Sequence, residues 1–217
     1  MSAYGILAAA VIFMVGLLWF ESRGARVGVL ATKAPLSLLF VLTAATQPFL
    51  IPVYHGFLLV GLLFCLAGDI FLALPGERAF LAGLVHFLLG HVFYVLAFFA
   101  MSGAGWWTLA GSCLAVGAGG IVWAWLRPSL GRMKGPVAAY IVVISLMVCG
   151  AAGVLGDSAL ETRGRILVMT GAFCFYVSDL FVARDRFVRK GFVNRLLGLP
   201  LYYAGQFMLA FSPAYLA

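Results

Sequence analysis

The chain has 217 residues, of which 65% are apolar and only 10% are charged. This composition excludes an ordinary soluble globular domain and indicates an integral membrane protein. The formal net charge of +7 could point to nucleic acid, but the basic residues stand in short loops without an aromatic stacking platform. Anionic lipid head groups explain these residues better, and no nucleic-acid partner is expected.

Apolar runs of about 17 to 21 residues follow one another along the chain, each long enough to cross a bilayer as a helix. They lack the polar alternation of a barrel strand, and only helices and closed barrels satisfy the backbone in a bilayer. The sequence therefore predicts an all-α, polytopic membrane protein, with residues 1–217 forming a single eight-helix transmembrane domain. The predicted spans are Tyr4 to Phe20, Ala34 to Ile51, Gly56 to Leu74, Phe80 to Ala100, Trp106 to Leu126, Val137 to Leu155, Ile166 to Ala183 and Leu196 to Leu216.

Basic residues gather in alternate loops between these spans. The first, third, fifth and seventh loops carry 12 of the 14 Lys and Arg residues, and only Arg163 and Arg165 lie on the other side. Because Lys and Arg accumulate on cytoplasmic loops, both termini are expected on the non-cytoplasmic side. The expected location is a bacterial inner (cytoplasmic) membrane.

Two aspartates lie inside apolar spans, and each opens a near-copy of one short segment. Asp69 begins DIFLA and Asp179 begins DLFVA. A charged carboxylate in hydrocarbon costs about 2 to 4 kcal/mol or more, so such a residue normally faces a polar cavity, although it can also simply bond a helix end or a neighbouring tyrosine. Both residues are expected about 6 to 8 Å inside the cytoplasmic boundary, and their matching positions predict one shared site.

Other polar residues are expected in the same half of the membrane. Lys33 is placed at the start of the second span, His86 on the fourth, and Tyr202 and Gln206 on the eighth. A cavity that opens toward the cytoplasmic leaflet explains this one-sided distribution. His91 lies five residues after His86 and therefore points about 140° away from it, so we expect His91 to be a structural hydrogen bonder.

No cofactor or metal is predicted. Three histidines in total are too few for a di-iron centre of the kind found in lipid oxidases. The four cysteines are isolated in separate spans, without the spacing of a disulfide framework or a zinc site.

The third and fourth spans are similar to the seventh and eighth. After each Asp segment comes a short charged loop with an aromatic residue, Phe80 or Phe187, and then a helix with glycine and tyrosine. Because the paired spans have the same orientation, a parallel four-plus-four internal repeat would explain the pattern, as in some transporters. Coincidence among apolar segments is the alternative.

At these residues the chain resembles the YhhN family of eight-span membrane proteins, whose characterised members are lysoplasmalogenases. Lys33-Ala34-Pro35 is similar to a Lys-Pro element at the head of the family's second helix, with an inserted Ala. The resemblance is densest in Gly68-Asp69, Phe80-x-x-Gly83-x-x-His86, His91-x-x-Tyr94, Gly171-x-x-x-Phe175-x-x-Ser178-Asp179 and Tyr202-Tyr203-x-x-Gln206.

The resemblance implies hydrolysis of the vinyl ether of a lysoplasmalogen to a fatty aldehyde and glycerophosphocholine or glycerophosphoethanolamine. A vinyl ether reacts when a proton reaches its distal carbon and water captures the resulting oxocarbenium ion, which requires one protonated and one ionised carboxyl. Asp69 and Asp179 are the expected pair, although the sequence does not say which one is the acid. The chain lacks a Gly-x-Ser-x-Gly elbow and a His-Glu-x-x-His motif.

The remaining expected site residues surround this pair. His86, Tyr202 and Gln206 are expected to set the hydrogen bonds of the carboxyls, and the basic side chains at the inner interface to meet the lipid phosphate. Tyrosines in such spans are by default packing residues, and a serine often bonds a helix carbonyl. The substrate-binding candidates are Lys33, Arg78, His86, Tyr94, Tyr176, Ser178, Arg184, Arg186, Tyr202 and Gln206.

Two other functions fit the sequence. A transporter or flippase for a lipid or small amphiphile would use both carboxylates as proton or cation sites. A lipid-sensing or structural protein would bind lipid without turnover. The expected partners are a lysophospholipid substrate and membrane lipids, with no obligate protein partner evident.

Overall fold

Long apolar helices build the chain, as the apolar runs predict. The structure is a computed structural model that describes residues 3–103 and 105–216, and these residues form helices and connecting turns without a strand. The all-α prediction is confirmed. The helices are α1 (Ala3–Arg23), α2 (Arg26–Ala45), α3 (Pro52–Ala73), α4 (Glu77–Met101), α5 (Trp106–Leu126), α6 (Lys134–Gly156), α7 (Thr162–Ala183) and α8 (Phe192–Phe211). Short turns follow at η1 (Arg127–Ser129), η2 (Gly131–Met133), the π-helical η3 (Arg184–Val188) and η4 (Ser212–Tyr215).

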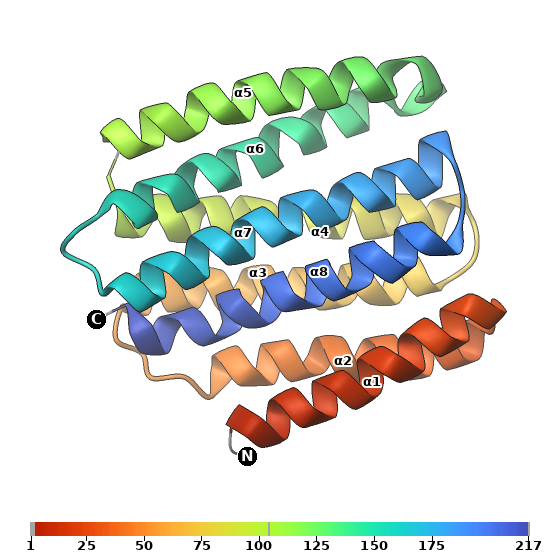
Figure 1. The fold of residues 1–217 in the computed structure, drawn as a ribbon, viewed down its shortest axis with the longest axis horizontal. Coiled ribbons are helices and arrows are strands. Elements are labelled where there is room, and N and C mark those ends of the chain that lie inside the picture. Colours follow the sequence, from red (N-terminus) through yellow and green to blue (C-terminus); the bar gives the residue numbers. More distant parts are fainter. Residues whose placement is uncertain (1–2, 104, 217) are drawn as a thin grey trace.

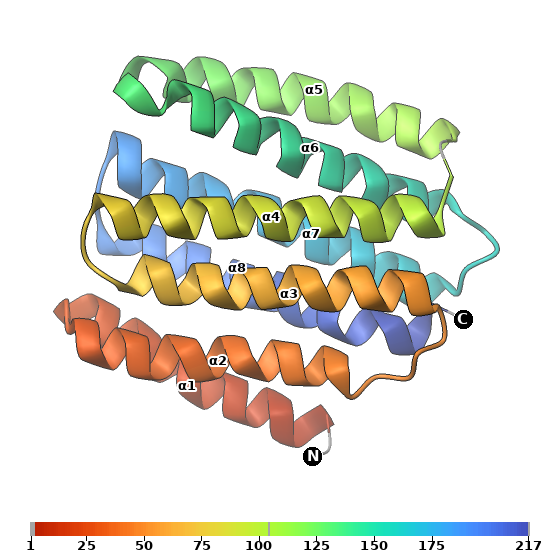
Figure 2. The same cartoon turned by 180° about the vertical axis from the view of Figure 1, so that it is seen from behind.

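The helices form one antiparallel bundle. The hairpins α3–α4 and α7–α8 pack together at its centre, α1 and α2 cover one side, and α5 and α6 cover the other (Figures 1 and 2). Successive helices alternate in direction, so the loops α1–α2, α3–α4, α5–α6 and α7–α8 lie at one end of the bundle. Both ends of the described chain lie at the opposite end (Figure 1).

The outer surface of the bundle is apolar. Leu114, Val116 and Ile121 on α5 are exposed, and every other helix carries exposed large apolar side chains as well. Of the eight helices in the described part of the chain, α1 to α7 are long and apolar enough to cross a membrane. The protein is therefore an integral membrane protein. Helix α8 falls below this apolar criterion because it contains polar residues that face the interior, among them Asn194 and Gln206.

Several predicted boundaries differ from the structure, among them the end of the second span, which is Ala45 rather than Ile51, and the start of the eighth, which is Phe192 rather than Leu196. Helix α2 begins at Arg26 rather than at Ala34, so the prediction that Lys33 begins the second span is wrong. Lys33 lies two turns inside the helix, where its charge is paired within the bundle, and Pro35 is accommodated in the helix interior. Helix α8 ends at Phe211 rather than at Leu216, because a proline in η4 changes the backbone there.

Glycines set the close approach within both central hairpins. A Cβ atom on Gly90 in α4 would lie 3.1 Å from the carbonyl oxygen of Gly61 in α3. In the other hairpin, a Cβ atom on Gly205 would lie 2.8 Å from the carbonyl oxygen of Gly171. Since these neighbours are backbone atoms, they cannot move aside as a side chain would, and the absence of a side chain permits each crossing.

Replacing Gly205 tests this packing. Gly205→Ala should lower stability by about 1 to 3 kcal/mol, because the methyl group would overlap the backbone of α7. The measurement is the apparent melting temperature of the purified protein in detergent. Gly117→Ala is the matched control, since nothing lies within 4 Å of a Cβ atom at that helical position. Equal melting temperatures for Gly205→Ala and the wild type would contradict the proposed close crossing.

Candidate active site

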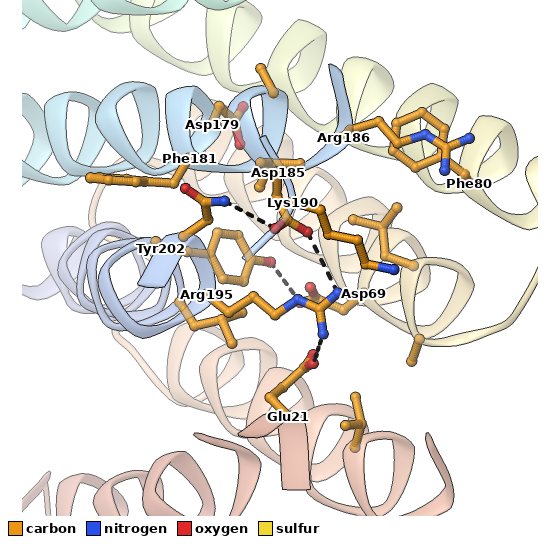
Figure 3. Close-up of a pocket in the computed structure, with 18 of the residues that line it drawn as sticks. Glu21, Asp69, Phe80, Asp179, Phe181, Asp185, Arg186, Lys190, Arg195 and Tyr202 are labelled. Atoms are coloured by element: carbon orange, nitrogen blue, oxygen red, sulfur yellow. Dashed lines mark hydrogen bonds and ion pairs between the residues drawn. The ribbon is translucent and has the colours of Figure 1, made fainter. Parts of the chain in front are cut away.

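A cavity of about 1040 Å³ lies at the end of the bundle that carries the basic loops. Its wall is built by the C-terminal ends of α1, α3 and α7 and the N-terminal parts of α2, α4, α6 and α8. Asp69 from α3 and Asp179 from α7 both line this cavity, 110 residues apart in the chain (Figure 3). The two carboxyls therefore have access to the same enclosed space.

Asp69 is almost completely buried and is surrounded by donors. The ammonium of Lys33 lies 3.0 Å from Oδ1, and the hydroxyls of Ser37 and Tyr202 each lie 2.6 Å from Oδ2. Lys33 and Ser37 are one helical turn apart on α2, so both reach the same carboxyl. Three donors, one of them charged, stabilise Asp69 as a carboxylate.

A second layer of hydrogen bonds fixes Tyr202. Gln206 donates from Nε2 to the Tyr202 hydroxyl at 3.2 Å, and Tyr94 donates to Oε1 of Gln206 at 2.8 Å. The hydroxyl of Tyr203 lies 2.9 Å from that of Ser37. The donors of Asp69 are thus held by a polar network that extends into the core between α4 and α8.

Asp179 has different surroundings. Tyr140 on α6 donates to Oδ2 at 2.6 Å, and Nε2 of His91 on α4 lies 3.9 Å from the same oxygen. Among the described residues, no Lys or Arg forms a salt bridge with Asp179. In the described chain Asp179 therefore has no cationic partner comparable to Lys33 at Asp69.

Several predicted residues share the cavity with these carboxyls. Arg186 lies at the cavity wall with its guanidinium 4.2 Å from the ring centre of Phe80 (Figure 3). Ser178 also contributes to the wall, but its hydroxyl donates to the carbonyl of Phe175 at 2.7 Å. The predicted site residues that line the cavity are Lys33, Asp69, Ser178, Asp179, Arg186 and Tyr202, with Tyr94 and Gln206 directly behind Tyr202.

Other predicted residues are not brought to the cavity. His86 bonds the carbonyl of Ala82 through Nδ1, and its ring packs 4.7 Å from that of Phe71. It is Phe87, one position along α4, that faces the cavity. The further candidates that do not line the cavity are Arg78, which is exposed, Tyr176, which is half-buried, and Arg184, which donates to Asn194.

Four residues at the carboxyls were not predicted as site residues. Tyr140 was expected only to pack, as tyrosines in such spans do by default, and His91 only to form a structural hydrogen bond. Tyr203 stood in the Tyr202-Tyr203-x-x-Gln206 motif without an assigned role, and Ser37 carried no motif. The spacing of Ser37 from Lys33 is a signal that could have identified it, because residues four apart share a helix face. Contacts between different helices, such as Tyr140 with Asp179, have no such signal.

An ion-pair cluster closes one side of the cavity mouth. Arg195 on α8 bonds Glu21 at the end of α1, and its other nitrogen lies 3.5 Å from Asp185 in η3 (Figure 3). Asn194 donates to the second oxygen of Asp185 at 3.0 Å. This cluster neutralises Arg195, whereas Arg186 has no carboxylate partner among the described residues.

Comparison with known proteins gives the family. The model described as the YhhN family matches residues 28–213. The chain belongs to the YhhN family. It is 34% identical over 155 residues to lysoplasmalogenase TMEM86A of Bos taurus, covering 70% of this chain and 63% of that protein.

Bacterial relatives give a similar result. The chain is 32% identical over 182 residues to lysoplasmalogenase of Mycobacterium bovis, covering 80% of this chain and 64% of that protein. The chain therefore spans less than two thirds of the length of these curated relatives. No solved structure matches it.

The Lys33–Asp69 pair gives a testable effect on stability. Lys33→Met should destabilise the protein by about 3 to 5 kcal/mol, because it leaves a buried carboxylate without its cation. The double variant Lys33→Met/Asp69→Asn removes both charges and should recover much of this loss. The comparison is made by unfolding both variants in detergent, and equal stability of the single and double variants would contradict the ion pair.

Proposed function

We propose that the chain is a membrane hydrolase that cleaves the vinyl ether bond of lysoplasmalogens, giving a fatty aldehyde and glycerophosphocholine or glycerophosphoethanolamine. One observation carries the proposal: a lysine-paired Asp69 and a cation-free Asp179 line the same cavity. Membership of the YhhN family and relatives named lysoplasmalogenase support the substrate class.

The reaction needs carboxyls of opposite protonation. The distal carbon of a vinyl ether accepts a proton, and the resulting oxocarbenium ion is captured by water to give a hemiacetal. A protonated carboxyl supplies the first step and an ionised carboxyl stabilises the cation and orients water, as paired carboxyls do for a related cation in glycosidases. Asp179 has the surroundings of the acid and Asp69 those of the carboxylate.

Proton transfers between these residues balance over one turnover. Asp179 gives its proton to the distal carbon, so a C–H bond forms as the C=C π bond breaks. Water attacks the neighbouring carbon, and Asp69 accepts the proton that water loses. Asp69 then returns this proton to the glycerol oxygen as that C–O bond breaks, while Asp179 takes the proton of the hemiacetal hydroxyl. Both carboxyls end in their initial protonation states.

The lining of the cavity fits a single-chain lipid. Arg186, Lys190 and Arg26 line its mouth, where cationic side chains suit a phosphate. Leu84 and Leu199 give apolar wall for the alkenyl chain. This places the head group near the basic loops and the enol ether deeper, at the level of the carboxyls.

The membrane placement follows from the same charges. We propose that the basic loops and the cavity mouth face the cytoplasm in a bacterial inner membrane, with both termini outside. Helix α8 runs antiparallel to α7 beside it (Figures 1 and 2), and its polar residues Asn194 and Gln206 are buried in the bundle, so we expect it to cross the membrane as the eighth span.

An internal duplication of four helices accounts for the arrangement of the site. Gly61 and Gly171 each precede the carboxyl of their hairpin by eight residues and each face a glycine of the next helix. Asp69 contacts α2 and α8, and Asp179 contacts α6 and α4, which is the crossed pattern that a four-plus-four repeat would generate.

Removal of either carboxyl tests the assignment. Asp179→Asn and Asp69→Asn should each lower kcat for aldehyde release from lysoplasmalogen by about 10² to 10⁴, the range for loss of an acid or base. Asp157→Asn is the control, because Asp157 lies in the loop between α6 and α7 at the far end of the bundle. Wild-type kcat in either cavity variant would refute its role.

Substrate analogues separate hydrolysis from the alternatives. Purified protein should release aldehyde from a lysoplasmalogen and not from its saturated ether or ester analogue, because only the enol ether can form the cation by protonation. Aldehyde is followed with a coupled dehydrogenase. Gradient-driven uptake of the intact lipid into proteoliposomes without product would instead indicate a transporter.

A further inference from the structure

His91 has one ring nitrogen whose role is fixed by the backbone. Its Nδ1 lies 2.6 Å from the carbonyl oxygen of Phe87, one turn earlier on α4. A carbonyl oxygen only accepts hydrogen bonds, so Nδ1 must carry the hydrogen. In the neutral ring Nε2 is then an acceptor with a free lone pair.

The lone pair on Nε2 has no donor in the described structure. The nitrogen is completely buried without a hydrogen-bond partner, and the nearest carboxyl oxygen is Oδ2 of Asp179, at 3.9 Å. The rings of Phe175, Tyr140 and Tyr94 pack around the imidazole, with their centroids 4.6, 5.1 and 6.4 Å from the centroid of the His91 ring. Tyr140 donates its hydrogen to Asp179 and Tyr94 donates to Gln206, so neither supplies Nε2.

An acceptor on His91 therefore faces a carboxyl that, if ionised, also only accepts. The Asp179 side chain is only 18% exposed and Nε2 of His91 is completely buried, so facing lone pairs on these two groups are unfavourable, and one shared proton removes the conflict. The separation of 3.9 Å closes to hydrogen-bond length with a shift of about 1 Å, and catalytic hydrogen bonds are commonly long before substrate binds.

We propose that Asp179 and His91 hold one proton in common in the resting protein, and that His91 is a positioning residue that keeps the acid loaded. This inference rests on the proposed function for its catalytic meaning. The carboxyl carries the proton and donates it to Nε2 until substrate arrives. The proton then passes to the vinyl carbon, and the proton of the hemiacetal hydroxyl later restores the pair.

The position of His91 in its hairpin supports this role independently. His91 directly follows Gly90, the crossing glycine of α4, and Gln206 directly follows Gly205, the crossing glycine of α8. Gln206 bonds Tyr202, which in turn donates to Asp69. The residue after each crossing glycine thus lies next to the carboxyl of the other hairpin, directly for His91 and through Tyr202 for Gln206. His86 has the same type of Nδ1 bond to a carbonyl but faces aromatic rings instead of a carboxyl.

Infrared spectra of the wild type and of each variant, recorded at neutral pH and subtracted from one another, test the shared proton directly. The wild-type protein should show a carboxylic acid C=O band that Asp179→Asn removes and that Asp69→Asn, which removes a carboxylate, retains. In His91→Gln the amide can donate to Asp179 and stabilise its ionised form, so the band should disappear. His55→Gln is the matched control and should keep the band. It also removes a completely buried imidazole, but His55 lies near the N-terminal end of α3, whereas Asp69 and the cavity lie at the C-terminal end.

Kinetics then separate this inference from the proposed function. His91→Gln should lower kcat by about 10² with KM changed less than threefold, whereas His55→Gln should keep both. A wild-type spectrum without an Asp179 acid band, or a His91→Gln variant that keeps both the band and wild-type kcat, overturns the inference even if aldehyde is released. If the band behaves as expected but no aldehyde forms, the shared proton stands and the proposed function fails. If His91→Gln does not fold, the wild-type and Asp179→Asn spectra still decide whether Asp179 carries the proton in the resting protein.

Discussion

A carboxyl in an apolar bundle depends on the cations and hydrogen-bond donors around it, and this constraint shapes the site. Asp69 has Lys33 and two hydroxyl donors. Asp179 meets a tyrosine hydroxyl and a neutral imidazole instead, and no lysine or arginine pairs with it in the described chain. Two chemically identical side chains therefore have different neighbours, and the proposed function assigns them opposite roles, one protonating the enol ether and the other stabilising the cation.

Helix packing brings these neighbours together. Glycine crossings draw α3 to α4 and α7 to α8, and the two hairpins then place each carboxyl against the helix of the other. Helix α8 contributes Tyr202, Gln206 and Arg195 to the site, which explains why, unlike α1 to α7, it is not apolar enough to count as a membrane span by composition alone. The same packing gathers Asp69, Asp179 and their donors at the cavity, where the proposed function requires a lipid head group near the membrane surface and its chain in the hydrocarbon.

The sequence predicts the helices, the carboxyl pair and Tyr202 as a hydrogen-bond partner, but not Ser37 at Asp69 or Tyr140 and His91 at Asp179. Apolar runs are long and strongly patterned, so α5 matches its predicted bounds, and the repeated Asp segment identifies residues that line one cavity. The five-residue spacing of His86 and His91 shows that the two rings point in different directions, but packing between α4, α6 and α7 decides which of them lies beside a carboxyl. Lys33 was predicted as a boundary because an isolated charge ends an apolar run, whereas its ion pair with Asp69 lets α2 continue through it.

The stereochemistry of proton delivery is the most direct test of the central claim that a fixed acid protonates the vinyl carbon beside a carboxylate. Lysoplasmalogen is hydrolysed in D₂O and the aldehyde is reduced in situ to prevent exchange. Delivery from Asp179 on one wall of the cavity predicts one deuterium at the carbon next to the former aldehyde carbon, in a single configuration. No deuterium at that carbon, or a racemic mixture there, would contradict the account.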